Sequence, residues 1–111
     1  MRNIYRIKDL FPNVAGIKIH YTEEYRSCFG IFNEEHCVAY NPDRIAEFAL
    51  DCINGDCTRK TFDLYSEVAG AVCHNEDKRS GTRQCDGRES AKHQHQCPVV
   101  LNYTILVEYL P

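Results

Sequence analysis

The clearest pattern in the chain is a strict alternation of apolar and mixed positions near its C-terminus. The apolar positions are Val99, Leu101, Tyr103, Ile105, Val107 and Tyr109. The positions between them are mixed in character, so the pattern predicts a strand with one buried face. A shorter alternation places Ile17, Ile19 and Tyr21 between polar residues, and it predicts a second half-buried strand.

Two further apolar runs, 28–32 and 37–40, are separated by the polar residues 33–36. A four-residue polar connection between apolar runs is typical of a hairpin. We therefore expect two antiparallel strands joined at 33–36.

Two helices are predicted between this hairpin and the C-terminal strand. Asn41, Pro42 and Asp43 form a helix-start signal, because they supply a capping side chain, a residue suited to the first helical position and an acid near the positive end of the helix dipole. A helix over 42–53 then carries Ile45, Phe48, Ala49 and Cys52 on one side. A second helix over 58–73 carries a stripe of Phe62, Tyr65, Ala69, Val72 and Cys73. The short linker between them favours an antiparallel pair.

These elements predict one α+β domain over residues 1–111. Its architecture is a two-layer sandwich, in which a mostly antiparallel sheet has two antiparallel helices packed on one face and disulfides stabilise the domain. Residues 74–96 contain no aliphatic side chain larger than alanine, and we expect them to form a polar excursion displayed from the body. Arg79, Arg83 and Arg88 lie in this excursion and are candidates for binding carboxylates of a partner. The competing interpretation is a solvated insertion without a role.

Composition narrows the class of protein. The 111 residues are 43% hydrophobic and 26% charged, as in a globular domain rather than a disordered or membrane-spanning segment. The 13 Lys and Arg residues face 16 Asp and Glu residues, and this net charge of −3 argues against a nucleic-acid-binding protein with a broad basic surface.

Cysteine is the outlier of the composition, with seven residues: Cys28, Cys37, Cys52, Cys57, Cys73, Cys85 and Cys97. So many cysteines in a small domain indicate secretion and a disulfide framework. We expect three intramolecular disulfides and one odd cysteine, with the pairing left open. The first residues lack the apolar segment of a signal peptide, so Met1 is interpreted as replacing a removed leader. The alternative is an intracellular protein whose cysteines are reduced.

A metal site is the alternative use of some of these residues. On an extended segment His93, His95 and Cys97 project to one face, with Cys85 nearby in the chain, and such ligands suit zinc or copper. Their spacing matches no paired zinc knuckle, so the first interpretation is exposed imidazoles between disulfides, with no cofactor.

Other chemistry is weakly represented. His20, or His36 with Glu34 and Glu35, offers the groups of an acid–base pair, but no motif supports catalysis and we expect a non-enzymatic protein. Asn102 begins an N-glycosylation pattern, Asn-Tyr-Thr.

The order of cysteines and elements resembles that of small secreted cysteine-rich fungal proteins. The resemblance rests on Cys37, a capped helix, Cys52, a glycine-containing linker, Cys57, a second helix ending in Cys73, the polar excursion and the terminal strand from Pro98. It is closest to virally encoded killer toxins of smut fungi and their relatives in plant-pathogenic fungi. The resemblance implies a disulfide-held α/β sandwich and a fungal effector. The chain has fewer cysteines at different intervals, so the channel-blocking activity of the toxins is carried over to no residue.

The first functional hypothesis is therefore a secreted, extracellular effector, with translocation into host cells as a variant, that binds a host protein or a second effector. The second is a toxin that acts on a membrane channel. The third is an intracellular zinc-binding or nucleic-acid-binding module with reduced cysteines. A count of thiols under denaturing conditions separates the third from the first two.

Overall fold

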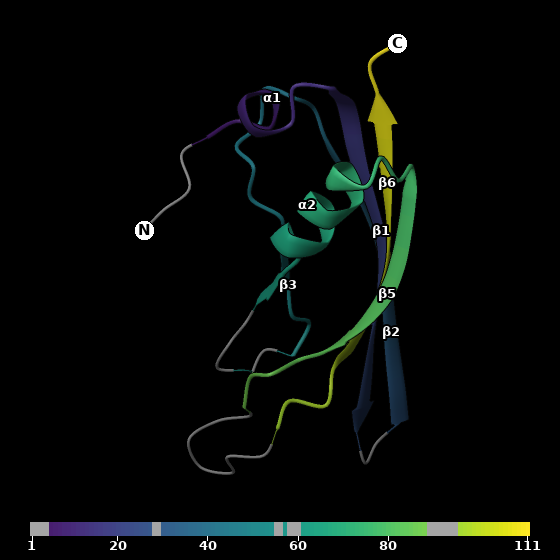
Figure 1. Ribbon diagram of the computed structural model, residues 1–111. Coiled ribbons are helices and arrows are strands. Elements are labelled where there is room, and N and C mark those ends of the chain that lie inside the picture. The colour runs from purple at the N-terminus through teal and green to yellow at the C-terminus, as the bar shows by residue number, and fades with distance from the viewer. Residues whose placement is uncertain (1–4, 28–29, 55–56, 58–60, 89–95) are drawn as a thin grey trace.

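The computed structural model describes residues 5–27, 30–54, 57, 61–88 and 96–111. Its main element is an antiparallel sheet with strand order β2-β1-β6-β5, formed by β1 (Val14–Ser27), β2 (Gly30–Tyr40), β5 (Lys78–Gln84) and β6 (Val100–Tyr109) (Figure 1). A small second sheet pairs β3 (Ala49–Asp51) with β4 (Thr61–Asp63). The helices are α1 (Ile7–Leu10) and α2 (Tyr65–Cys73), and neither is long enough to cross a membrane.

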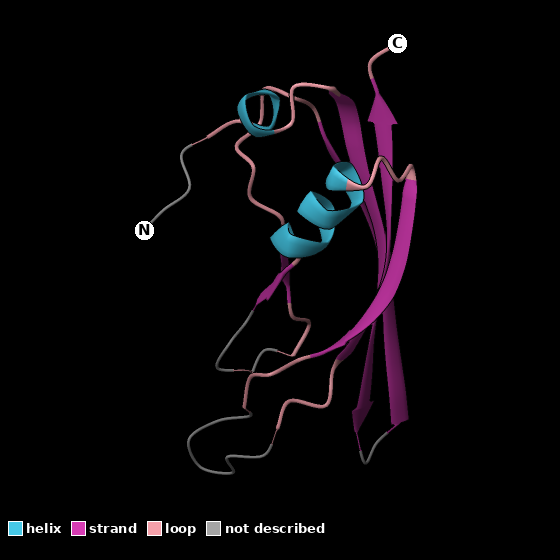
Figure 2. Cartoon of the chain, in the orientation of Figure 1, coloured by secondary structure: helices cyan, strands magenta, loops and turns pink. Residues whose placement is uncertain are grey.

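One face of the main sheet is covered and the other is open. Helix α2, the β3–β4 pair and the turn of α1 lie on the covered face, together with long irregular connections (Figure 2). The sheet contributes Ile17, Ile19, Leu101 and Ile105 to the core, and Phe48 of the covering layer is fully buried against them. The hydrophobic core thus lies between one face of the sheet and a layer that is mostly not helical.

The predicted C-terminal strand is confirmed. Strand β6 buries Leu101, Tyr103, Ile105 and Val107, as the alternation requires, and it pairs with β1 on one side and β5 on the other. A strand between two neighbours has its backbone groups paired on both edges, which suits the position with the strongest apolar pattern.

The predicted hairpin connection at 33–36 is wrong. These residues lie within β2, which pairs with β1 without interruption from Ile17↔Tyr40 to Ser27↔Gly30. Strand β2 is the edge of the sheet, and nearly all of its side chains are exposed. An edge strand with both faces in water needs no apolar alternation, so its polar residues resemble a connection in the sequence.

The predicted α+β sandwich with two antiparallel helices is also wrong. Residues 42–48 form turns and extended chain that lead into β3, and the buried residues of the segment 42–53 are Ala46, Phe48 and Leu50, with exposed residues between them. This period of two belongs to a strand, and it competes in the same segment with the helical spacing of Ile45, Phe48, Ala49 and Cys52. Ile45, which the helix required inside, is 49% exposed.

The second predicted helix is shorter than 58–73. Residues 61–63 form β4, helix α2 begins at Tyr65, and residues 58–60 lie outside the described part of the chain. The carboxylate of Asp63 accepts a hydrogen bond from the Tyr65 backbone N–H at 3.0 Å and so satisfies a donor of the first helical turn. Cys73, expected to point inward, is exposed at the end of α2.

The polar excursion is partly a strand. Residues 78–84 form β5, which pairs with β6 and closes the sheet on the side opposite β2. On the covered face β5 presents Arg79, Gly81 and Arg83, and its other positions face water, so no aliphatic pattern marks it in the sequence. A search for apolar periodicity does not find an edge strand that is stabilised by arginine contacts.

Candidate metal centre

Four cysteines meet below the hydrophobic core, where the covering layer approaches the ends of β5 and β6. Cys52 directly follows β3, Cys85 directly follows β5, and Cys97 precedes β6; Cys57 completes the group. Their four sulfur atoms all lie within 4.8 Å of one another. The Sγ atoms of Cys52 and Cys97 are 3.7 Å apart, and those of Cys57 and Cys85 are 3.5 Å apart.

These separations are those of ligands around one ion rather than of bonded sulfurs. A disulfide requires about 2.05 Å between sulfurs. Four thiolates at about 2.3 Å from a tetrahedral ion lie about 3.8 Å from one another. Within the described residues no cysteine pair is at disulfide distance, so the predicted disulfide stabilisation is wrong there. Cys28 lies outside the described residues, while Cys37 and Cys73 are exposed and take no part in the cluster.

Burial leaves one side of the cluster open. Cys57, Cys85 and Cys97 are at most 1% exposed, whereas Cys52 is half-buried. Burial raises the pKa of the Cys52 thiol and raises the pKa of Cys85 to about 12. Both thiols are therefore protonated at neutral pH without a cation, and an ion that binds them must displace their protons.

Two short backbone turns support the sulfurs. The N–H of Asn54 bonds to the thiol of Cys52, and the N–H of Gly87 bonds to the thiol of Cys85; each bond lowers the pKa of its thiol against the larger effect of burial. The Cys57 N–H in turn donates to the Asn54 carbonyl at 3.0 Å. The same arrangement at two cysteines, N–H of residue i+2 to sulfur of residue i, favours thiolates and orients them.

Side chains from outside the cluster complete this support. The amide Nδ2 of Asn54 lies 3.4 Å from the sulfur of Cys97 and donates to it. Glu23 of β1 is 1% exposed, and its Oε1 accepts the backbone N–H of Ile53 at 3.0 Å. Burial raises the pKa of Glu23, while the Ile53 N–H opposes that rise. A buried carboxylate therefore fixes the chain between Cys52 and Cys57 to the sheet.

The sequence indicated only half of this centre. The structure brings Cys85 and Cys97 together, but His93 and His95 lie outside the described residues. Cys52 and Cys57 were interpreted as disulfide candidates, although their C-x₄-C spacing falls within the usual range for a zinc knuckle. That spacing was the signal missed, because the helix predicted over 42–53 placed Cys52 on a buried stripe.

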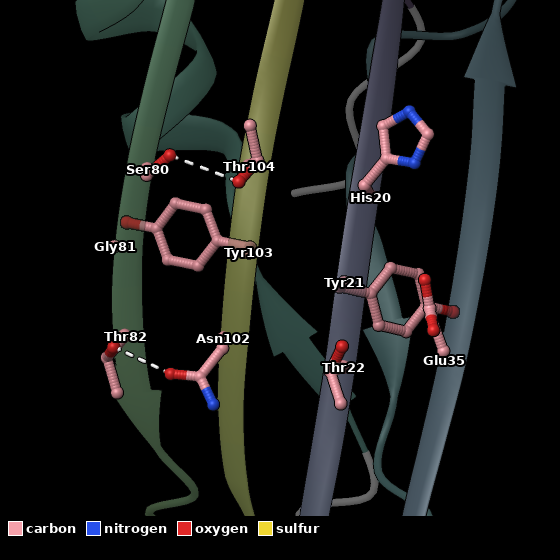
Figure 3. A pocket seen from close by; sticks show the side chains of 10 residues that line it. All are labelled: His20, Tyr21, Thr22, Glu35, Ser80, Gly81, Thr82, Asn102, Tyr103 and Thr104. Atoms are coloured by element: carbon pink, nitrogen blue, oxygen red, sulfur yellow. Dashed lines mark hydrogen bonds between the residues drawn. The ribbon is translucent and has the colours of Figure 1, made fainter.

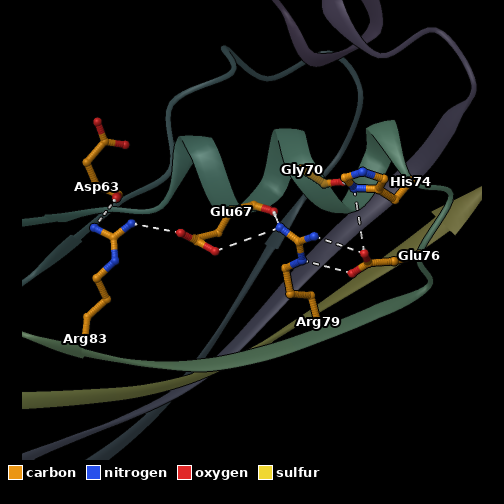
Figure 4. A network of polar contacts seen from close by, with 7 residues as sticks. All are labelled: Asp63, Glu67, Gly70, His74, Glu76, Arg79 and Arg83. Atoms are coloured by element: carbon orange, nitrogen blue, oxygen red, sulfur yellow. Dashed lines mark hydrogen bonds and ion pairs between the residues drawn. The ribbon is translucent and has the colours of Figure 1, made fainter.

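Two of the three arginines predicted to bind a partner, Arg79 and Arg83, contact this chain's own acids. Arg79 forms two 2.9 Å hydrogen bonds to the carboxylate of Glu76 and contacts Glu67 of α2 (Figure 4). Arg83 donates to Glu67 at 3.1 Å and to the Asp63 carbonyl at 3.2 Å. The pKa of Glu76 is lowered, chiefly by its hydrogen bond to Arg79. Arg79 and Arg83 thus connect β5 to α2.

Two other sequence candidates are not members of the cluster. Arg88 is exposed and forms a bridge with Gln96. Asn102 is exposed on the open face of β6, where its side-chain oxygen accepts a 2.9 Å hydrogen bond from Thr82 (Figure 3). The roles predicted for them, partner binding and glycosylation, stay predictions.

The open face of the sheet carries a shallow polar cavity of about 500 Å³ (Figure 3). His20, Glu35 and Asn102 are among its lining residues, and the Sγ of Cys37 lies 3.7 Å from Nε2 of His20. His36 and Glu34, 3.3 Å apart, lie on the other face of the same strands. The histidines of the acid–base hypothesis are therefore separated by the sheet.

Comparison of the chain with models of known families, with curated proteins and with solved structures found no match. The metal centre therefore rests on its geometry and its chemistry.

Proposed function

We propose that this chain is a zinc-binding domain in which Cys52, Cys57, Cys85 and Cys97 hold one structural Zn²⁺ ion. The observation that carries the proposal is the meeting of four sulfur atoms, supplied by separate parts of the chain, within 4.8 Å. Four thiolate ligands fill the tetrahedral positions of zinc, which is the arrangement of structural rather than catalytic sites. The ion would tie the covering layer to the ends of β5 and β6.

Zinc is the ion that best suits these ligands. Soft thiolates select zinc, copper(I) or iron among the common metals, and they do not suit magnesium or calcium. A tetrahedral set of four thiolates is typical of zinc and of iron bound to cysteine. Elemental analysis of the protein as purified distinguishes these two ions directly.

The proposal also concerns the compartment in which the protein works. Thiols that bind zinc must remain reduced, as they do in the cytosol or nucleus. The secreted effector, its host or effector partner and the toxin alternative stay predictions from cysteine number and family resemblance. A count of free thiols in the denatured protein tests the effector and toxin predictions, since a secreted protein of either type would carry disulfides.

The test is the metal content of the protein purified with a reductant and without added metal, and the thiol state of a second portion that is purified without a reductant. We expect one zinc per chain by elemental analysis and by native mass spectrometry, and all seven cysteines alkylated after denaturation with a chelator. Two disulfides, Cys52–Cys97 and Cys57–Cys85, in a protein that never binds metal would overturn the proposal.

Matched variants locate the ion. Cys57→Ser removes a buried member of the cluster and should abolish stoichiometric zinc. Cys37→Ser and Cys73→Ser remove exposed thiols outside the cluster and should leave the zinc content unchanged. Equal loss of zinc in all three variants would show that the metal binds elsewhere.

A further inference from the structure

A second feature lies on the covered side of the sheet, beyond the core, where the β1–β2 hairpin extends past the metal centre. Tyr25, Phe32 and Glu34 of the hairpin line a cleft of about 380 Å³ together with Ile53 and Asn54, the two residues after Cys52. We call it the hairpin cleft. Two aromatic rings and a carboxylate thus line an opening beside the cluster.

The aromatic side of the cleft includes a large side chain that is exposed to solvent. Phe32 is 54% exposed, and its ring centroid lies 6.4 Å from that of its cross-strand partner Tyr25, with the rings tilted by 41°. Tyr25 is half-buried against the core, so it supports the exposed ring of Phe32, which can present a face to an incoming group.

The acidic side of the cleft favours a positively charged ligand. Glu34 lies two residues from Phe32 on the same face of β2. The charges of Glu34 and Asp51 both raise the pKa of the buried Glu23, so three carboxyl groups lie within electrostatic reach of one another here. His36 pairs with Glu34 at 3.3 Å, and the five lining residues include no lysine or arginine.

We propose that the hairpin cleft binds an arginine side chain of a partner protein. A guanidinium group stacks on aromatic faces and forms two parallel hydrogen bonds with a carboxylate, and few other groups do both. Side chains two residues apart on one strand face are about 7 Å apart, so one guanidinium over Phe32 can reach Glu34. A phosphate backbone would meet the same carboxylates and be repelled. An apolar segment would remove water from the Glu34 carboxylate and offer it no hydrogen bond in return.

This binding site goes beyond the proposed zinc site and does not require a particular ion. It reverses the expectation from the sequence, in which arginines of this chain were to bind carboxylates of a partner. Arg79 and Arg83 are engaged with this chain's own acids, whereas the hairpin presents a carboxylate and aromatic rings to the outside.

The test is a titration of the full chain, at a measured metal content, with three short peptides followed by NMR. The peptides are capped Gly-Ser-X-Ser-Gly with X as arginine, lysine or citrulline. We expect saturable shifts of the Phe32 and Glu34 amide signals with the arginine peptide, binding at least about threefold weaker with lysine, and none with citrulline, because citrulline keeps the shape but lacks the charge. Binding should weaken as salt is raised.

Neighbouring residues on opposite faces of β2 supply matched controls. Phe32→Ala and Glu34→Gln should each weaken the arginine peptide by about fivefold. Ile31→Ala removes a side chain of similar exposure, 57%, from the other face, and Glu35→Gln removes a charge there; both should leave affinity within about twofold of the original.

Three results would overturn the proposal: no saturable shift with the arginine peptide, equal losses from Glu34→Gln and Glu35→Gln, or tighter binding of an eight-nucleotide single-stranded RNA than of the peptide. Because the metal content is measured separately, a chain without zinc that still binds the peptide contradicts only the zinc site. A zinc-loaded chain that does not bind contradicts only the cleft.

Discussion

The covering layer is held on the sheet by different means at its two ends. Around Phe48 and α2, aliphatic and aromatic side chains pack against Ile17, Ile19 and Ile105 of the sheet. Beyond them the core-facing positions of β1 are Glu23 and Tyr25. At this end the cluster of four cysteines lies between the covering layer and the sheet. Where the apolar surface of a small domain ends, the proposed zinc ion would supply stability that burial cannot.

Strand β1 makes two kinds of contact with the covering layer. The covered face of β1 carries Ile17 and Ile19 in its first half and the buried acid Glu23 in its second half, and β1 pairs with β6 from Val14 to Glu24. The first half needs only shape and hydrophobicity from the covering layer. The second half needs directed contacts, such as the Glu23–Ile53 hydrogen bond.

The largest effect should come from breaking the cysteine end. Cys57→Ser removes a ligand and should lower the free energy of unfolding by more than about 4 kcal/mol, because zinc binding and folding are coupled. Urea denaturation with and without a strong chelator measures this. With the chelator present, the variant and the original chain should unfold at nearly the same urea concentration; a difference as large as that without chelator would mean that metal plays no part.

Breaking the apolar end should give the next largest effect. Phe48 is fully buried, so Phe48→Ala should cost about 3 to 5 kcal/mol through lost burial and a cavity. Unlike the loss at Cys57, this loss should be similar with and without the chelator. A cost below about 1 kcal/mol would contradict the packing of the covering layer on the sheet.

The apolar end was the more predictable from the sequence, though only at the level of individual residues. Phe48 was correctly placed in the core, but on a helix, because Asn41-Pro42-Asp43 and the helical spacing outweighed the alternation of Ala46, Phe48 and Leu50. Local patterns cannot decide between two periods that share a residue; the pairing of β3 with β4 decides it.

The cysteine end was less predictable because it depends on topology. Cys52 and Cys97 are 45 residues apart, and they meet because β5 and β6 pair and the covering layer folds back over them. Seven cysteines in 111 residues fit both a disulfide framework and a metal site until their sulfur atoms are placed. Glu23 was missed because a single acid in an alternating strand gives no sign that it is buried.

A smaller effect is expected at Glu23, which connects β1 to the residue after Cys52. Glu23→Ala removes the acceptor for the Ile53 N–H and should weaken zinc affinity about 10- to 100-fold, as loss of a supporting contact to a ligand does. Glu23→Gln keeps an oxygen acceptor and should recover most of the affinity. Competition with a chromogenic chelator measures both.

The control for this prediction is the adjacent residue. Glu24 lies on the opposite face of β1, where Arg26 pairs with it at 3.2 Å, so Glu24→Ala should leave zinc affinity unchanged. Equal affinities for Glu23→Ala and Glu24→Ala would show that zinc binding does not depend on the hydrogen bond between Glu23 and Ile53.

The smallest effect should come from the arginines that connect β5 to α2, on the apolar side of the molecule. The sequence predicts that replacing Arg79, Arg83 and Arg88 together by serine leaves the melting temperature nearly unchanged. The structure predicts a fall of a few degrees, because Arg79 and Arg83 hold Glu67 and Glu76 and the guanidinium of Arg79 lies against Gly70 of α2. Their partial exposure limits the fall in melting temperature, and added salt should reduce that fall.

Arg88→Ser alone removes an arginine that contacts neither Glu67 nor Glu76. Thermal denaturation should give this variant the melting temperature of the original chain, and the zinc content should be the same in all these variants. A triple variant that melts with the original chain would show that α2 is held on the sheet without these arginines, through its buried residues Val68, Ala71 and Val72.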